Sequence, residues 1–133
     1  MARGPENTFI ASVHRLLPET LYRMKNHNEY NGGIPDCWYS GRYDLWVEYK
    51  FITIPKRDTT LVVPELSTLQ REWVTERYKE GRAVGVIVGC KEGGVYLTPH
   101  LLQGISTEEF RARLRTRRQL ADLIVFFTSN APS

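Results

Sequence analysis

Two carboxylates and a lysine lie close together in one aromatic-rich segment, residues 32–52. Its second half has the β-branched and aromatic residues of a strand, whose side chains alternate between two faces, so Glu48 and Lys50 share a face. If the chain makes a hairpin that turns about Arg42, Asp36 lies directly opposite Glu48. Like charges so placed destabilise a sheet unless they are neutralised, and a hard divalent cation is the simplest candidate. The segment therefore predicts a site for metal-assisted phosphodiester cleavage, with Lys50 beside the attacking water or the phosphoryl group.

The register of this hairpin decides between two interpretations of the charges. The register that pairs Asp36 with Glu48 also places Trp38 opposite Trp46, and a shift by one residue would abolish both pairs. The alternative is that Asp36 only ends a loop, while Glu48 and Lys50 form an exposed pair worth well under about 1 kcal/mol. The aromatic context of the charges favours the metal site.

The same residues resemble the signature of the PD-(D/E)XK nuclease superfamily, as Pro35–Asp36 followed by Glu48–Tyr49–Lys50. The likeness is greatest to small phage-type and virus-type replication-repair nuclease domains and to Holliday-junction-resolvase-like members. In these, a Gly-Ile-Pro-Asp element such as residues 33–36 precedes the first carboxylate. The resemblance extends over about residues 6–90.

The resemblance implies an α/β, restriction-endonuclease-like fold, and it implies roles for the residues of the motif. Asp36 and Glu48 are implied to bind Mg²⁺, for which Mn²⁺ would substitute, with the Tyr49 backbone carbonyl as a possible third ligand. Lys50 is implied to lie near the attacking water. The implied activity is metal-dependent hydrolysis of DNA by an endonuclease, acting in recombination and repair on junctions or as a homing or nicking enzyme.

Two further residues match the family, and each has a competing structural explanation. Glu6 matches a helix-borne glutamate that many members point at the metal, but an acid in a first helical turn also interacts favourably with the helix dipole. Gln70 matches a glutamine near the site, but Ser67 and Gln70 also have the spacing of a capping box. Both explanations stay open for each residue.

The elements that must position these residues follow from periodicity and from Gly and Pro punctuation. They form one domain, a central mixed sheet flanked by helices with further helices at the C-terminus, because each amphipathic helix needs a sheet face to cover. The order is helix 6–17, strand 20–25, loop 26–33, the hairpin, polar loop 55–64, helix 67–79, strands 84–88 and 95–98, and two short helices that begin at Ser106 and Thr116.

Charge and composition permit a nucleic-acid partner. The chain of 133 residues has a formal net charge of +3, and five arginines fall in the eight positions 111–118. Such a cluster suggests contact with a phosphate backbone but is also compatible with a solvated helical face. The residues expected to meet DNA are Lys25, Lys56, Arg57, Arg111, Arg113, Arg115, Arg117 and Arg118. Paired cuts in a junction would need a homodimer or a higher homo-oligomer.

Other function classes are disfavoured. Cys37 and Cys90 lack the spacing of a zinc site, the N-terminal residues lack a signal-peptide pattern, and the apolar runs are too short for a bilayer. We therefore expect a cytoplasmic protein of a bacterium or of a phage-infected cell, with no membrane partner. Two alternatives to a nuclease remain: a non-catalytic nucleic-acid-binding module, and an interaction domain on which the charges are surface features.

Overall fold

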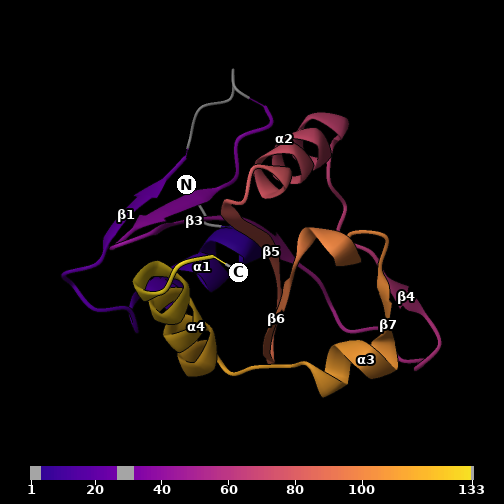
Figure 1. The fold of residues 1–133 in the computed structure, drawn as a ribbon. Helices are drawn as coiled ribbons and strands as arrows, with labels where there is room; N and C mark the ends of the chain where they lie inside the picture. Colours follow the sequence, from indigo (N-terminus) through magenta and orange to yellow (C-terminus); the bar gives the residue numbers. More distant parts are fainter. Residues whose placement is uncertain (1–3, 27–31, 133) are drawn as a thin grey trace.

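The structure, a computed structural model, describes residues 4–26 and 32–132 (Figure 1). Five strands form a mixed sheet in the order β1-β2-β3-β5-β6, and two short strands, β4 and β7, form a second sheet. In chain order the elements are α1 (Pro5–His14), β1 (Tyr22–Lys25), β2 (Cys37–Ser40), β3 (Asp44–Phe51), β4 (Leu61–Val62), α2 (Thr68–Lys79), β5 (Ala83–Cys90), β6 (Gly93–Leu97), the 3₁₀ helix η1 (Pro99–Leu101), β7 (Ile105–Ser106), α3 (Thr107–Ala112) and α4 (Arg117–Ser129).

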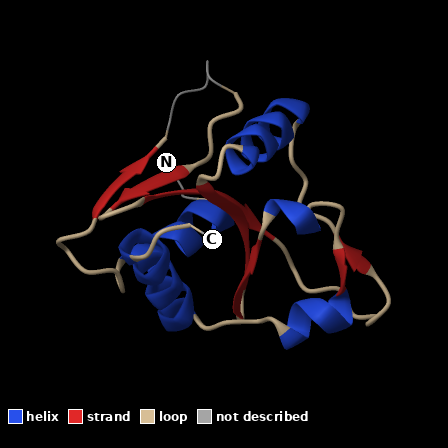
Figure 2. Cartoon of the chain, in the orientation of Figure 1, coloured by secondary structure: helices blue, strands red, loops and turns tan. Residues whose placement is uncertain are grey.

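Helices cover both faces of the five-stranded sheet (Figure 2). Alternating residues of β3 explain this: Leu45, Val47 and Tyr49 are buried in one core cluster together with residues of α1 and α4. The other face packs against α2 through a second cluster that includes Val74 and Val86. The predicted α/β architecture, a central mixed sheet flanked by helices with helices at the C-terminal end, is confirmed.

The hairpin of β2 and β3 has the predicted register. Trp38 pairs with Trp46 and Cys37 with Val47, so Asp36, the residue just before β2, lies opposite Glu48. Strand β3 also pairs in parallel with β5, and α2 lies in the connection between them. The end of β3 that carries the charged residues is thereby fixed between two neighbouring strands.

Helix α1 lies very close to the sheet at Gly89. A Cβ atom at this position would be 2.7 Å from the Phe9 ring, which also contacts the rings of Tyr49 and Phe51 at centroid distances of 6.3 and 6.0 Å. The absence of a side chain at Gly89 therefore allows Phe9 to pack directly on β5. This contact brings α1 close to the sheet.

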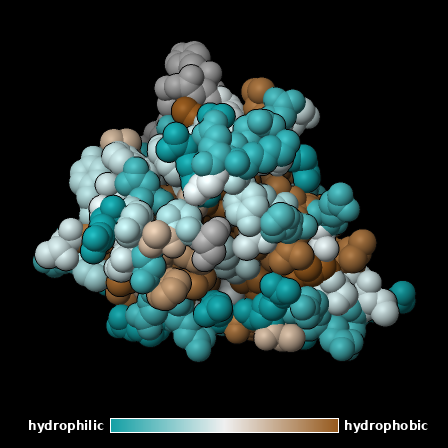
Figure 3. Space-filling view, viewed as in Figure 1, coloured by the Kyte–Doolittle hydropathy of each residue, from teal (hydrophilic) through white to brown (hydrophobic). Residues whose placement is uncertain are grey.

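The prediction of a polar loop over residues 55–64 is wrong in part, because Leu61–Val62 pairs as β4 with Ile105–Ser106 of β7. Strands of two residues are too short to show an alternating pattern. In Figure 3 apolar surface is concentrated on the side of β4 and β7, where Leu61 and Val63 are exposed, whereas the surface over α2 is largely hydrophilic.

The helix expected over 6–17 ends as an α-helix at His14, and the strand expected over 20–25 begins at Tyr22. Of the loop expected over 26–33, residues 27–31 lie outside the described part. Within that part, no helix is long and apolar enough to span a membrane.

Candidate active site

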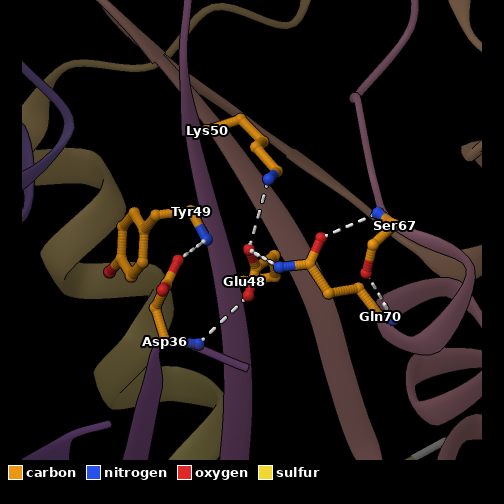
Figure 4. Close-up of polar contacts among 6 residues, drawn as sticks. All are labelled: Asp36, Glu48, Tyr49, Lys50, Ser67 and Gln70. Carbon is orange, nitrogen blue, oxygen red and sulfur yellow. Dashed lines mark hydrogen bonds and ion pairs between the residues drawn. The ribbon is translucent and has the colours of Figure 1, made fainter. Parts of the chain in front are cut away.

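Asp36 and Glu48 are held against each other by two reciprocal hydrogen bonds (Figure 4). The Asp36 backbone N–H donates to Glu48 Oε1 at 3.1 Å, and the Tyr49 backbone N–H donates to Asp36 Oδ2 at 2.9 Å. Each carboxylate thus accepts a main-chain hydrogen bond from the segment that carries the other. The pair lies where β2 begins and is fixed by the backbone of both strands.

Lys50 and Gln70 approach the second oxygen of Glu48. Lys50 Nζ lies 3.5 Å from Glu48 Oε2, and Gln70 Nε2 donates to the same oxygen at 2.9 Å. Both oxygens of Glu48 therefore have donors, and the side chain, of which only 2% is exposed, is held in one orientation.

Gln70 fulfils both of the explanations that the sequence left open. Its Oε1 accepts from the Ser67 backbone N–H at 2.9 Å and its own backbone N–H donates to Ser67 Oγ at 3.1 Å, which completes the capping box of α2. Since Oε1 is used by the cap, the amide nitrogen points to Glu48. The start of α2 and the orientation of Glu48 are fixed by the same amide.

Glu6, in the first turn of α1, also lies in this group. Its pKa is raised by burial and next by the negative charge of Asp36, with which it forms a side-chain hydrogen bond. Two carboxyl groups hydrogen-bond to each other only when one is protonated. Lys50 and then Lys25, at the end of β1, oppose the rise in the pKa of Glu6, and Lys25 Nζ donates to Asn7 Oδ1 at 2.6 Å.

Burial and then the charge of Asp36 raise the pKa of Glu48 to about 8, against the opposing effects of Lys50 and of the Asp36 N–H. Without a cation, the protein therefore disfavours the charged form of Glu48. A cation placed between the two carboxylates would favour the charged form.

The donor set fits a hard divalent cation that is only partly coordinated by protein. No group of three or more His, Cys, Asp or Glu side chains within residues 4–26 and 32–132 is arranged to hold a metal, so Glu6 does not complete such a group with Asp36 and Glu48. The Tyr49 carbonyl lies on the same edge of β3 as its N–H, which faces Asp36. Two carboxylates and a carbonyl, completed by water and phosphate oxygen, are typical of Mg²⁺ sites.

Three of the predicted DNA-binding residues lie together. Lys56 and Arg57 are exposed in the loop that follows β3, and an Arg111 N–H donates to the Pro55 carbonyl at 3.5 Å, which brings α3 beside this loop. Their charges therefore gather on the segment that follows β3.

The arginines of residues 111–118 do not form one surface. The Arg117 guanidinium donates to Ser12 Oγ and to the Cys90 and Lys91 carbonyls at 2.8 to 3.3 Å, and it lies 4.9 Å from the centroid of the Phe9 ring. These contacts show that Arg117 joins α4 to α1 and the sheet, instead of facing solvent as a phosphate contact would.

The other arginines of this segment differ in their partners. Arg113 forms an ion pair with Glu109 at 3.1 Å, and an Arg118 N–H donates to the Leu16 carbonyl at 3.3 Å. Arg115 is exposed, and its backbone forms an isolated bridge with Gly94. Of this segment, Arg111 and Arg115 remain as the simplest candidates for a backbone contact.

One cluster of buried polar side chains was not predicted from the sequence. Behind Glu48, the Tyr49 hydroxyl lies 2.6 Å from the Tyr39 hydroxyl, which lies 2.7 Å from His14 Nε2. The alternation of strands places both tyrosines on the face opposite to Glu48, but the contact with His14 depends on how α1 packs, which spacing does not give.

Comparison with known proteins finds a likeness among solved structures. No family model matches the chain, and no curated protein does. Among solved structures, the chain is similar to Hjc, a Holliday junction resolvase of the archaeal hyperthermophile Archaeoglobus fulgidus, with a TM-score of 0.55 and 15% sequence identity over 87% of this chain and 99% of that chain. At this identity the likeness establishes a shared fold. The chain therefore has the resolvase-like nuclease fold, consistent with the restriction-endonuclease-like architecture that the sequence predicts.

Proposed function

We propose that this protein is a divalent-metal-dependent endonuclease that hydrolyses phosphodiester bonds in branched DNA. The observation that carries the proposal is the convergence of Asp36, Glu48 and Lys50 at one end of β3, with the two carboxylates in reciprocal contact. The likeness to a Holliday junction resolvase supports it, since the two chains share a fold. Junction resolution in recombination or repair is the activity we propose, ahead of homing or nicking.

The residues of the site have distinct roles in this proposal. Asp36, Glu48 and the Tyr49 carbonyl would hold Mg²⁺ or Mn²⁺, which supplies a more acidic water and positive charge for the phosphoryl oxygens. Lys50 positions the attacking water or offsets the negative charge that develops on the phosphate. Gln70 holds Glu48 in place through Oε2.

Positive side chains outside the site would bind the DNA backbone. Lys56, Arg57 and Arg111 are placed beside the loop that leaves β3, and Arg115 is exposed near the start of β6. We propose that two copies of the chain act together, since paired cuts across a junction require two sites related by symmetry.

The test is cleavage of supercoiled, linear and four-way-junction DNA by the purified protein, with Mg²⁺ and with EDTA. We expect product only with the metal, and we expect Asp36→Asn to abolish it. Asp44→Asn is the matched control, because it makes the same change at an exposed position of the same hairpin. Cleavage that persists in Asp36→Asn contradicts the proposal.

A non-catalytic nucleic-acid-binding module is the second candidate. It is favoured by the absence of a three-carboxylate group among the described residues. It predicts that the wild-type protein binds junction DNA in a salt-dependent manner but forms no product with any divalent metal.

A further inference from the structure

The three tryptophans of the chain lie in a single row of aromatic rings. Trp38 stacks on Trp46 with a centroid distance of 5.6 Å and an interplanar angle of 17°. Tyr22 meets the edge of Trp38 at 5.5 Å, and Trp73 of α2 contacts Trp46 at 5.2 Å. We name Tyr22, Trp38, Trp46 and Trp73 the aromatic row.

The aromatic row lies beside the carboxylate pair on the sheet. Trp46 precedes Glu48 by two residues and Trp38 follows Asp36 by two, so the row and the site occupy the same face of the same two strands. Two residues of a strand span about 7 Å, which separates the stacked rings from the carboxylates. A ligand bound along the row would therefore pass within about 7 Å of the carboxylates.

The outer end of the row is open. Tyr22 is 53% exposed and its neighbour on this face, Met24, is 49% exposed, because they lie on the edge strand β1. By contrast, α2 packs on the inner end through Trp73. The row is therefore exposed at Tyr22 on the sheet edge and becomes half-buried toward Trp73.

Charge along this face changes with position. The β1 and β2 residues that share it with the rings carry no charge, whereas Lys50 lies at the carboxylate end. Lys25 belongs to the opposite face, where it contacts Asn7 of α1. A nucleic-acid strand has flat, uncharged bases and a negatively charged backbone, so its bases would lie on the rings with a phosphate toward Lys50.

We infer that the aromatic row stacks unpaired bases of the strand that enters the active site. The substrate class is then DNA with unpaired nucleotides beside the scissile phosphate, such as a fork, a flap or a single-stranded extension. This inference rests on the proposed function, which identifies the adjacent carboxylates as the cleavage site. It adds a preference that a fully paired junction does not satisfy.

Tryptophan fluorescence tests the inference without cleavage, because all three tryptophans belong to the row. We would titrate the protein with a short oligothymidine in EDTA and expect saturable quenching. Tyr22→Leu should weaken binding about 5- to 150-fold, the loss expected for one stacked base, and Tyr22→Trp should retain it. The control is Phe126→Leu on α4, where the ring is 57% exposed and far from the row in sequence and in packing, and binding should be unchanged.

Two results would overturn the inference. One is binding without quenching together with an unchanged affinity of Tyr22→Leu, which means that the bases do not touch the row. The other is a dimer in sedimentation that Tyr22→Leu converts to monomers, which would assign the row to a second copy of the chain. Tyr22 lies at an exposed edge, so its replacement should leave the fold intact, and circular dichroism checks this.

A cleavage assay separates failure of the inference from failure of the proposed function. With Mg²⁺, we expect the wild type to cut forked duplexes faster than a fully paired duplex, and Tyr22→Leu to remove most of the difference. If the wild type cuts both equally, the inference fails and the proposed function stands. If it cuts neither but is quenched by oligothymidine, the proposed function fails, while base stacking on the row is retained.

Discussion

The two faces of β3 place polar groups in opposite situations. Toward α1 and α4, Tyr49 joins Tyr39 and His14 in a chain of hydrogen bonds of 2.6 and 2.7 Å. Toward α2, the adjacent residue Glu48 faces Asp36. On the first face neutral groups satisfy one another, so nothing is left to bind. On the second, two acids share a small space, and the charge of Lys50 only partly offsets their repulsion.

Burial acts on both faces and favours the neutral form of each titrating group. Burial, and next the charges of Arg23 and Lys25, lowers the pKa of His14 to about 4, so its imidazole is neutral at neutral pH. Burial raises the pKa of Glu48 to about 8. The difference is that a bound cation would return Glu48 to its charged form, whereas nothing comparable faces His14. The buried polar groups toward α1 and α4 thus contribute to stability, whereas those toward α2 are suited to bind a cation.

Lys50→Met should have the largest effect of the changes considered, and it should act on the cleavage rate far more than on stability. Removing a group that assists the attacking water should lower kcat by about 10²- to 10⁴-fold, while the free energy of unfolding changes little because the ammonium is partly exposed. Single-turnover cleavage and urea unfolding measure the two effects. A loss of stability as large as the loss of rate would place Lys50 among the structural residues.

The opposite result is expected for Tyr39→Phe. This change leaves the Tyr49 hydroxyl and His14 Nε2 without their shared partner, and it should cost about 2–4 kcal/mol of stability. Below the unfolding transition, kcat should stay near that of the wild type. Tyr22→Phe is the control, since that ring is exposed and its hydroxyl is not buried. A selective loss of kcat in Tyr39→Phe would remove the distinction between the faces.

The pH dependence of stability should have opposite signs on the two faces. Unfolded His14 binds a proton below about pH 6.5 but folded His14 only below about 4, so stability falls by about 3 kcal/mol as the pH drops through this window. Folded Glu48 keeps its proton up to about pH 8, against 4.5 as its ordinary value, so its contribution is lost as the pH rises between these values.

Urea unfolding between pH 4 and 9, with and without Mg²⁺, measures both slopes. His14→Gln should flatten the acid side, and Mg²⁺ should flatten the alkaline side because it stabilises the charged carboxylate. If Mg²⁺ has no effect on the alkaline side, the carboxylate pair does not bind the ion.

The smallest expected effect separates two roles of one residue. Ser67→Ala and Gln70→Ala both remove the capping box and should each cost about 1 kcal/mol. Only Gln70→Ala also removes the donor to Glu48, so it alone should reduce activity or Mg²⁺ affinity, by about 10- to 100-fold. Equal activity of the two variants would show that Gln70 acts only as a cap.

The site could be predicted from the sequence wherever local rules decide the geometry. The register of the hairpin follows from strand alternation, since Trp38 and Trp46 pair in the same register as Asp36 and Glu48. The cap at Ser67 follows from spacing alone. These rules bring the main residues of the site together without knowledge of the rest of the fold.

Features that depend on packing between distant elements could not be predicted in this way. Charge density does not reveal that the Arg117 guanidinium turns inward to Ser12, because that depends on how α4 meets α1. The contact of His14 with Tyr39 has the same origin. Strands as short as β4 carry no pattern at all, and their pairing is decided by the segments that they connect.

Gly89 has no functional group, yet the position of Glu6 beside Asp36 depends on it. The Phe9 ring occupies the space that a methyl group at Gly89 would fill. This contact sets the distance between α1 and the sheet. Glu6 is carried by the same helix, one turn earlier, and reaches Asp36 only at that height. A single added carbon at Gly89 would push α1 away from the sheet. Glu6 would then move away from Asp36 and Glu48.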